Sequence, residues 1–84
     1  MSIKKKTHQI IEWFGWYGVL AILGAYGLLS FGFIVSDHPV YQLLNLTGAV
    51  ALSIDAWVDR DYQPVVLNII WMLIAFISLL RLFL

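Results

Sequence analysis

The chain has 84 residues, of which 62% are hydrophobic and only 12% are charged, and its formal net charge is zero. A soluble domain this small is mostly surface and needs a far more polar composition, so we infer that the surplus apolar side chains face lipid. A neutral chain also lacks the basic field of a nucleic-acid-binding protein, and the lack of cysteine excludes disulfides and thiolate chemistry. The composition predicts an integral membrane protein that binds no nucleic acid.

The first apolar run extends from Trp13 to Val35 and follows a basic cluster at residues 4–6. It is longer than the ~7–15-residue core of a secretory signal peptide, and no small-residue cleavage site closes it. A polar segment, Ser36-Asp37-His38-Pro39, ends the run. We therefore predict a retained membrane-spanning helix over residues 12–35.

Two further apolar runs follow, at residues 40–58 and 64–84. Each is close to the ~20 residues that a helix needs to cross the hydrocarbon core, where irregular backbone is not tolerated. Pro39 and Pro64 stand at the predicted helix starts, where a proline removes no intrahelical hydrogen bond. Asp37 and Asp61 precede them as candidate N-caps. We predict helices over residues 39–58 and 64–84, in one transmembrane domain of residues 1–84.

Basic residues predict the orientation of these helices. With three spans, Lys4, Lys5, Lys6 and Arg60 fall on one side of the membrane, and Arg81 falls on the other. Because basic residues concentrate on the cytoplasmic side, the N-terminus is expected in the cytoplasm and the C-terminus outside. The chain is thus expected to be a multi-pass protein of a cell inner (plasma) membrane.

Each predicted helix carries a stripe of small or polar residues at helical spacing, opposite a face rich in Leu, Ile, Val and Phe. Small residues let membrane helices approach closely. The fold class is therefore predicted as all-α, a compact bundle of three transmembrane helices. The stripes are Gly18, Ala21, Ala25 and Gly32; then Gln42, Asn45, Ala49, Ser53 and Ala56; then Asn68, Trp71, Ala75 and Ser78.

The polar residues inside the spans fall at two depths. With ~1.5 Å of rise per residue, Tyr26 and Asn45 share the outer half, whereas Asp55 and Asn68 share the inner half. Trp71 is near mid-membrane, where its indole N–H needs a partner. Tyr26, Asn45, Asn68 and Trp71 are candidate substrate-binding residues. The alternative is that the two asparagines form interhelical hydrogen bonds that only hold the helices together.

Asp55 is the side chain that packing explains least well. An ionisable group inside a membrane is a functional hypothesis by default, so Asp55 is a candidate proton or cation site. The alternative is that Asp55 lies near enough to the boundary to reach water or to pair with Arg60.

No catalytic constellation is present in the sequence, which has no Ser-His-Asp set, no HExxH motif and no phosphate-binding glycine loop. His8 and His38 stand alone and make poor metal ligands. We therefore expect no enzyme activity, no metal site and no cofactor.

Two segments carry a resemblance to a known family. Tyr41-Gln-Leu-Leu-Asn-Leu-Thr-Gly48 fits Y-x-L-L-N-x-x-G, and Val66-Leu-Asn-Ile-Ile-Trp71 fits V-L-N-x-x-W. With Gly24-Ala25-Tyr26 in the first helix, the chain resembles a family of short, uncharacterised bacterial inner-membrane proteins with three helices. This resemblance implies a location but no activity.

The chain also resembles, more weakly, the bacterial half-transporters of the PQ-loop type, which have three helices in about this length and work as dimers. Their third helix has a substrate-contacting asparagine, which Asn68, four residues after Pro64, would match. The first helix here has no Pro-Gln motif.

Two functions follow as hypotheses. The first is a small non-enzymatic membrane protein that assembles with itself, as a dimer, or docks onto a larger membrane protein. The second is a homodimeric half-transporter that moves a small polar solute through a site at the subunit interface, because three helices alone cannot enclose a ligand. In both, the lipid bilayer is the surrounding partner.

Overall fold

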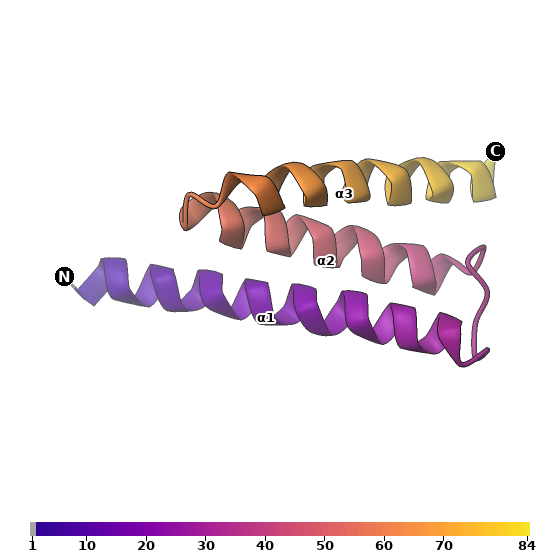
Figure 1. Ribbon diagram of the computed structural model, residues 1–84, viewed down its shortest axis with the longest axis horizontal. Helices are drawn as coiled ribbons and strands as arrows, with labels where there is room; N and C mark the ends of the chain where they lie inside the picture. Colours follow the sequence, from indigo (N-terminus) through magenta and orange to yellow (C-terminus); the bar gives the residue numbers. More distant parts are fainter. Residues whose placement is uncertain (1) are drawn as a thin grey trace.

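The computed structural model describes residues 2–84, with side chains from Lys6 onwards, so the Lys4 and Lys5 side chains used above for orientation lie outside the described part. The chain folds into three helices: α1 (Ser2–Ser30), α2 (Pro39–Val58) and α3 (Tyr62–Phe83). α2 runs antiparallel to both neighbours, and the two termini lie at opposite ends of the long axis (Figure 1). The predicted all-α class with three helices is confirmed.

The first helix differs from the predicted range of residues 12–35 at both ends. It begins at Ser2, and it ends at Ser30 because Gly32 adopts a left-handed backbone with φ of 82°. The Phe33 N–H then donates to the Leu28 carbonyl at 2.9 Å and the Gly32 N–H to the Leu29 carbonyl at 3.1 Å. This is a Schellman motif, which satisfies the last carbonyls of the helix. Residues 31–38 form a loop that the apolar sequence did not reveal.

The second helix begins where it was predicted, but its cap is a different residue. His38 is the N-cap, and its Nδ1 accepts a hydrogen bond from the Val40 N–H at 3.1 Å. Pro39 occupies the first turn, where it lacks only an N–H that would be unpaired anyway. The Asp37 carboxylate is therefore not the cap of α2.

The α2–α3 turn is also built on a left-handed residue. Arg60 has φ of 57°, the Asp61 N–H donates to the Ala56 carbonyl at 2.9 Å, and the Arg60 N–H donates to the Trp57 carbonyl at 3.1 Å. This second Schellman motif places an arginine where glycine is the usual choice. α3 begins at Tyr62, two residues before the predicted start at Pro64. Asp61 stands at its N-cap position, but the predicted capping hydrogen bond from the Asp61 side chain is not formed.

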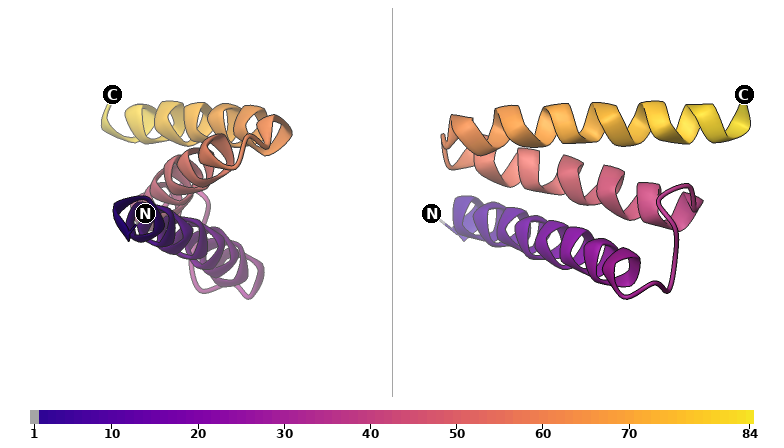
Figure 2. Two further views of the ribbon diagram at one scale, coloured as in Figure 1. Left: turned by 90° about the vertical axis from the view of Figure 1, so that its left-hand side faces the viewer. Right: turned by 45° about the vertical axis from the view of Figure 1, so that its right-hand side comes forward.

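The arrangement is open, so the prediction of a compact bundle is wrong. α2 packs against α1 on one side and against α3 on the other, and within residues 2–84 α1 and α3 make no contact. The end-on view on the left of Figure 2 shows the three helices in a zigzag with α2 in the middle. The Cα radius of gyration is 14.1 Å, against the ~12 Å typical of a compact domain of this length.

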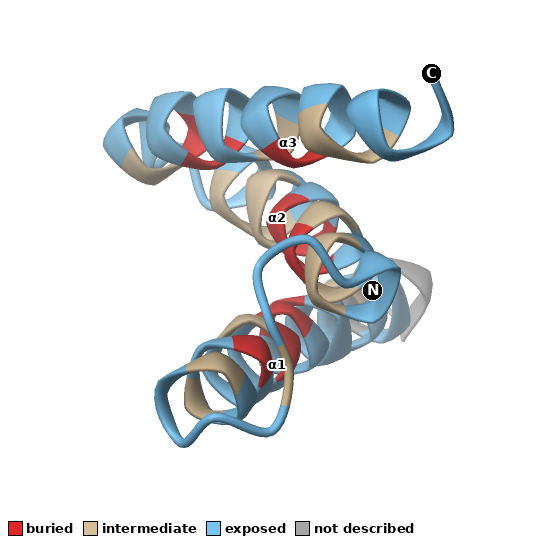
Figure 3. Ribbon diagram, turned by 90° about the vertical axis from the view of Figure 1, so that its right-hand side faces the viewer, coloured by how far each residue is buried: buried red, intermediate tan, exposed pale blue. Residues whose placement is uncertain are grey.

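Small residues dominate the α1–α2 interface, whereas α3 buries Val65, Asn68 and Ala75. Among the side chains from Lys6 onwards, buried positions lie where α2 meets its neighbours (Figure 3), and most of them are alanine or glycine. At the α1–α2 crossing, a Cβ added to Gly18 would come within 2.7 Å of the Gly48 carbonyl oxygen, so the two backbones are almost in contact. Beside this crossing, the Thr47 hydroxyl donates a hydrogen bond to the Leu43 carbonyl. Its oxygen therefore accepts from the Tyr17 hydroxyl at 2.7 Å.

The surface is apolar along all three helices. Among the described side chains no large one is fully buried, whereas Leu20, Leu23 and Ile74 are each more than 60% exposed. The accessible surface is 6339 Å², against the ~5,100 Å² expected for a soluble monomer of this mass. Two helical segments within the described residues, Lys6–Ser30 and Tyr62–Phe83, are long and apolar enough to cross a membrane. α2, which carries Gln42 and Asp55, is not among them.

Candidate functional site

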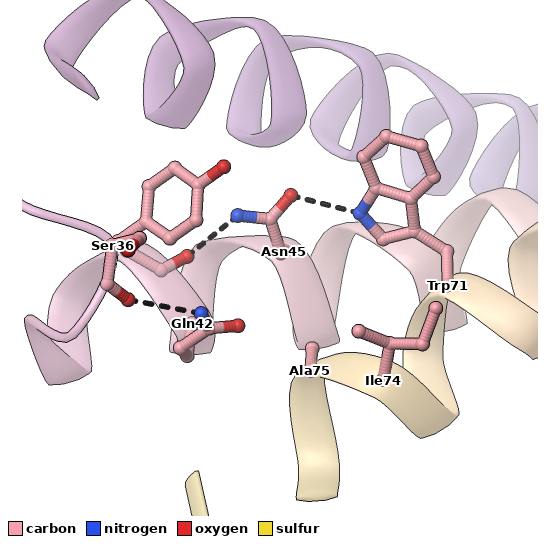
Figure 4. Close-up of a pocket in the computed structure, with 7 residues that line it drawn as sticks. Ser36, Gln42, Asn45, Trp71, Ile74 and Ala75 are labelled. Atoms are coloured by element: carbon pink, nitrogen blue, oxygen red, sulfur yellow. Dashed lines mark hydrogen bonds between the residues drawn. The ribbon is translucent and has the colours of Figure 1, made fainter. Parts of the chain in front are cut away.

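A cavity of about 350 Å³ lies between α2, α3 and the loop that precedes α2. Polar groups line the side of the cavity nearest the loop, and apolar side chains of α3 line the other (Figure 4). The lining residues are Ser36, Tyr41, Gln42, Asn45, Trp71, Ile74 and Ala75.

Asn45 and Trp71 bridge the two helices at this cavity. The Trp71 indole Nε1–H donates to Asn45 Oδ1 at 2.9 Å, and Asn45 Nδ2 donates to the Tyr41 carbonyl at 2.8 Å (Figure 4). Asn45 is only 4% exposed, so both ends of its amide are satisfied inside the protein. The hydrogen bond fixes the register of α3 on α2 and gives the Trp71 N–H the partner it needs.

A second cavity, of about 360 Å³, continues from the first toward the C-terminus of α3. The two share Ser36 and Gln42. Gln42 Nε2 donates to the Ser36 carbonyl at 3.0 Å, which ties the loop to α2. The remaining lining residues are Asp37, Ser78, Arg81 and Leu82.

Two predicted binding residues lie elsewhere. Tyr26 is 64% exposed on α1 and does not line the cavity with Asn45. Asn68 is 8% exposed, and its Nδ2 donates to the Pro64 carbonyl of its own helix at 2.8 Å. Tyr26 and Asn45, which the sequence placed at one depth, therefore lie on different helices and do not line one cavity, and their binding roles stay predictions.

Asp55 faces α1 rather than Asn68. It lines a cavity of about 270 Å³ together with Glu12, Gly15 and Asp59. A Cβ added to Gly15 would lie 2.5 Å from Asp55 Oδ2, so the glycine makes room for the carboxylate. Within the described side chains Asp55 makes no salt bridge, and the suggested pairing with Arg60 is not formed.

His8 connects the two helices at this end of the molecule. Its Nε2 lies 3.5 Å from Asp59 Oδ1, and its Nδ1 lies 3.9 Å from Glu12 Oε1. All three side chains are exposed, so these contacts contribute little to stability. Among the described residues, no group of three potential metal ligands comes together.

Several lining residues were not chosen from the sequence as site candidates. Gln42 and Ser78 belong to the same stripes as Asn45 and Trp71, so the helical spacing contained a signal for them. Ser36, Asp37 and Arg81 gave no such signal, because the loop conformation brings the first two against α3. The cavity can hydrogen-bond a small polar group and cover an apolar one.

Comparison with known proteins assigns the chain to a protein family. No curated protein and no solved structure matches the chain, and the resemblance to PQ-loop half-transporters is not shown. A model of one uncharacterised family matches residues 11–84. This range includes residues 11–30 of α1, the whole of α2 and α3, and the residues that line both cavities between α2 and α3. The chain is therefore a member of this uncharacterised protein family.

Proposed function

We propose that the protein is a non-enzymatic, three-pass protein of the inner membrane that assembles with itself or docks onto a larger membrane protein. The observation that carries this proposal is the exposure of large apolar side chains along all three helices. Water would not tolerate such a surface on an 84-residue monomer, whereas lipid would.

The central position of α2 supports a third span. α2 contacts α1 on one side and α3 on the other, so less of it would face lipid than of its neighbours. A helix sheltered on two sides can carry Gln42, Asn45 and Asp55, because these face protein or cavities. The lower apolar content of α2 is then a consequence of its place in the fold.

Cysteine labelling of intact cells tests the number of spans, and the chain contains no cysteine that would give a background. Val35→Cys lies in the α1–α2 loop, and Asp61→Cys lies in the α2–α3 turn. We expect an impermeant maleimide to label Val35→Cys from outside and Asp61→Cys only after permeabilisation. Equal labelling of both positions from one side would mean that α2 does not cross, and recovery of the chain in the soluble fraction would refute the membrane proposal itself.

Assembly is proposed to use the outer face of α1. A Cβ added to Gly24 or Gly27 would meet no atom within 4 Å, so this part of α1 presents backbone to the surroundings. Since lipid supplies no hydrophobic force between helices, close backbone approach is a major source of their association. A second copy of the chain fits this role, and a homodimer is favoured.

Native mass spectrometry in mild detergent tests the assembly. Asn68→Ala and Asp55→Asn are expected to leave a dimer intact, because Asn68 bonds to its own helix and Asp55 lies against α1 of the same chain. Gly24→Leu is expected to weaken the dimer, and Val66→Leu, which adds bulk to an exposed position of α3, is the matched control. A dimer that Gly24→Leu leaves unchanged would show that this face of α1 is not used.

A second candidate, a half-transporter, is favoured by one observation. The cavity beside Asn45 and Trp71 combines hydrogen-bonding groups with apolar walls, as a neutral-solute site requires. In reconstituted vesicles, Asn45→Ala should abolish the uptake of any transported solute, and Asn68→Ala should leave it intact. Uptake that is lost with Asn68→Ala but not with Asn45→Ala would assign the site differently.

A further inference from the structure

The two cavities along α2 and α3 form one groove with a charged end and an apolar end. Ser36 and Gln42 line both cavities, so the cavities adjoin. On α3 the groove follows Trp71, Ala75, Ser78 and Arg81, which recur every three or four residues and so lie on one face. With ~1.5 Å of rise per residue, Trp71 and Arg81 are ~15 Å apart along the helix.

The charged end holds one acid and one base that do not pair. Asp37 and Arg81 line the same cavity, yet within the described residues no carboxylate oxygen lies within 4 Å of the Arg81 guanidinium. Asp37 does not cap α2, because His38 takes that role. Both charges are therefore available to a ligand.

The loop that carries Asp37 is held in place before any ligand arrives. Ser36, the residue before Asp37, accepts a hydrogen bond at its carbonyl from Gln42 Nε2 at 3.0 Å. His38, the residue after Asp37, is bonded through its side chain to the first turn of α2. A carboxylate fixed between two anchored residues loses little further freedom on binding.

We propose that this groove binds a phospholipid whose headgroup carries both a phosphate and a primary ammonium, as in phosphatidylethanolamine. The Arg81 guanidinium would bind the phosphate through paired N–H donors, and the Asp37 carboxylate would accept from the ammonium. One acyl chain would follow the groove past Ala75 and Ile74 toward Trp71. The proposal rests on the proposed function, because a lipid ligand requires the chain to reside in a membrane.

Charge complementarity selects this headgroup over two common alternatives. A lipid with a phosphate but no amine would satisfy Arg81 and place a negative headgroup beside Asp37. A quaternary trimethylammonium has no N–H to donate to the carboxylate. The ~15 Å length of the groove selects a lipid over a free phosphate–amine compound, which would fill only the charged end.

Native mass spectrometry of the full chain in mild detergent tests the proposal with three lipids of one acyl composition: phosphatidylethanolamine, phosphatidylcholine and phosphatidylglycerol. We expect several-fold more adducts with phosphatidylethanolamine than with either of the other two lipids. Arg81→Gln and Asp37→Asn should each lower the phosphatidylethanolamine adducts to the amount seen with phosphatidylcholine. Arg60→Gln and Asp61→Asn make the same changes at the opposite end of the molecule and should leave those adducts unchanged.

Three results would overturn the proposal. One is equal retention of the three lipids, and another is a preference for phosphatidylglycerol. The third is an equal loss of adducts with the Arg60→Gln control. Displacement of the lipid by millimolar O-phosphoethanolamine would show that the headgroup chemistry alone is recognised, and this would exclude the acyl part of the assignment.

A second readout follows the acyl chain. Phosphatidylethanolamine with brominated acyl chains should quench tryptophan fluorescence in the wild type more than in Trp71→Phe, because Trp71 lies at the apolar end of the groove. Equal quenching would place the chain elsewhere. The cysteine-labelling test reports on membrane insertion separately, so a chain that inserts correctly but shows no lipid preference would refute the groove and leave the membrane function standing.

Discussion

Asn45 and Asn68 are the same residue type at similar burial, but their hydrogen bonds differ. Each donates its side-chain amide to the carbonyl four residues earlier in its own helix. Asn45 alone also accepts a hydrogen bond from another helix, through the Trp71 indole. The sequence predicted that both asparagines either form interhelical hydrogen bonds or bind a substrate. In the structure Asn45 forms the interhelical hydrogen bond. The binding roles of both stay predictions.

The Asn45–Trp71 bond should be measurable in a double-mutant cycle. Asn45→Ala and Trp71→Phe each remove one partner, and interhelical hydrogen bonds in membranes contribute about 0.6–1.7 kcal/mol. We expect a coupling of that size in the free energy of unfolding in detergent, measured by denaturant titration. Asn68→Ala paired with Trp71→Phe is the matched control, and a coupling just as large there would contradict the assignment.

At the scale of elements, the glycines of α1 and α2 have two separate roles. Gly18 and Gly48 allow the backbones of α1 and α2 to touch, whereas Gly24 and Gly27 have open space around them. Helical spacing placed Gly18 in a predicted stripe and the other three beside one, because spacing identifies a stripe of small residues but not the helix that packs on it. Spacing also did not locate the end of α1. The apolar segment Phe31–Val35 was predicted as helix, but the left-handed backbone of Gly32 ends the helix at Ser30.

Alanine substitutions at two glycines of α1 should have opposite effects. A Cβ at Gly18 would lie 2.6 Å from Leu52 Cγ and 2.7 Å from the Gly48 carbonyl oxygen, so Gly18→Ala should destabilise by about 1–3 kcal/mol through overpacking. Gly24→Ala meets nothing within 4 Å in the single chain, so in a detergent that dissociates the proposed dimer it should stabilise by about 0.5–1 kcal/mol through reduced chain entropy. Thermal unfolding in one detergent compares the two, and destabilisation of equal size would refute this α1–α2 crossing.

Substitutions at the two residues with left-handed backbone, Gly32 and Arg60, should change stability in opposite directions. Gly32→Ala should destabilise by about 1–2 kcal/mol, because its φ of 82° places a Cβ against the next carbonyl. Arg60→Gly should stabilise by up to about 1 kcal/mol, because Arg60 already bears that strain at φ of 57°. Both are read from unfolding midpoints. A destabilised Arg60→Gly variant would mean that the arginine side chain stabilises the turn.

At the scale of the whole molecule, the open zigzag is the feature that decides what the protein can do. α1 and α3 lie on opposite sides of α2 and, across residues 2–84, do not touch. Each therefore has a long face available to lipid or to another protein. A compact bundle would have covered much of both faces.

Engineered cysteine pairs distinguish the zigzag from a compact bundle. A Cβ added to Gly48 would lie 3.3 Å from the Ala21 Cβ, so Ala21→Cys with Gly48→Cys should form a disulfide within one chain on mild oxidation. Gly24→Cys with Phe76→Cys joins exposed positions of α1 and α3 and should not. An efficient disulfide within one chain for the second pair, seen as a faster-migrating monomer, would favour the bundle.

The sequence by itself determined the three helices, the start of α2 at Pro39 and the stripes of small and polar residues. It predicted three membrane spans, and two helical segments, Lys6–Ser30 and Tyr62–Phe83, are long and apolar enough for that role. Apolar composition and the period of 3.6 residues act within one helix, so they can be read without the fold. Tertiary structure alone decided that α3 does not close onto α1, that the Trp71 indole bonds to Asn45, and that Asp37 and Arg81 meet in one cavity. The physical reason is that every helix has a small-residue stripe, and apolar surroundings provide no hydrophobic force to choose among pairings. That choice depends on close backbone contact and hydrogen-bond geometry.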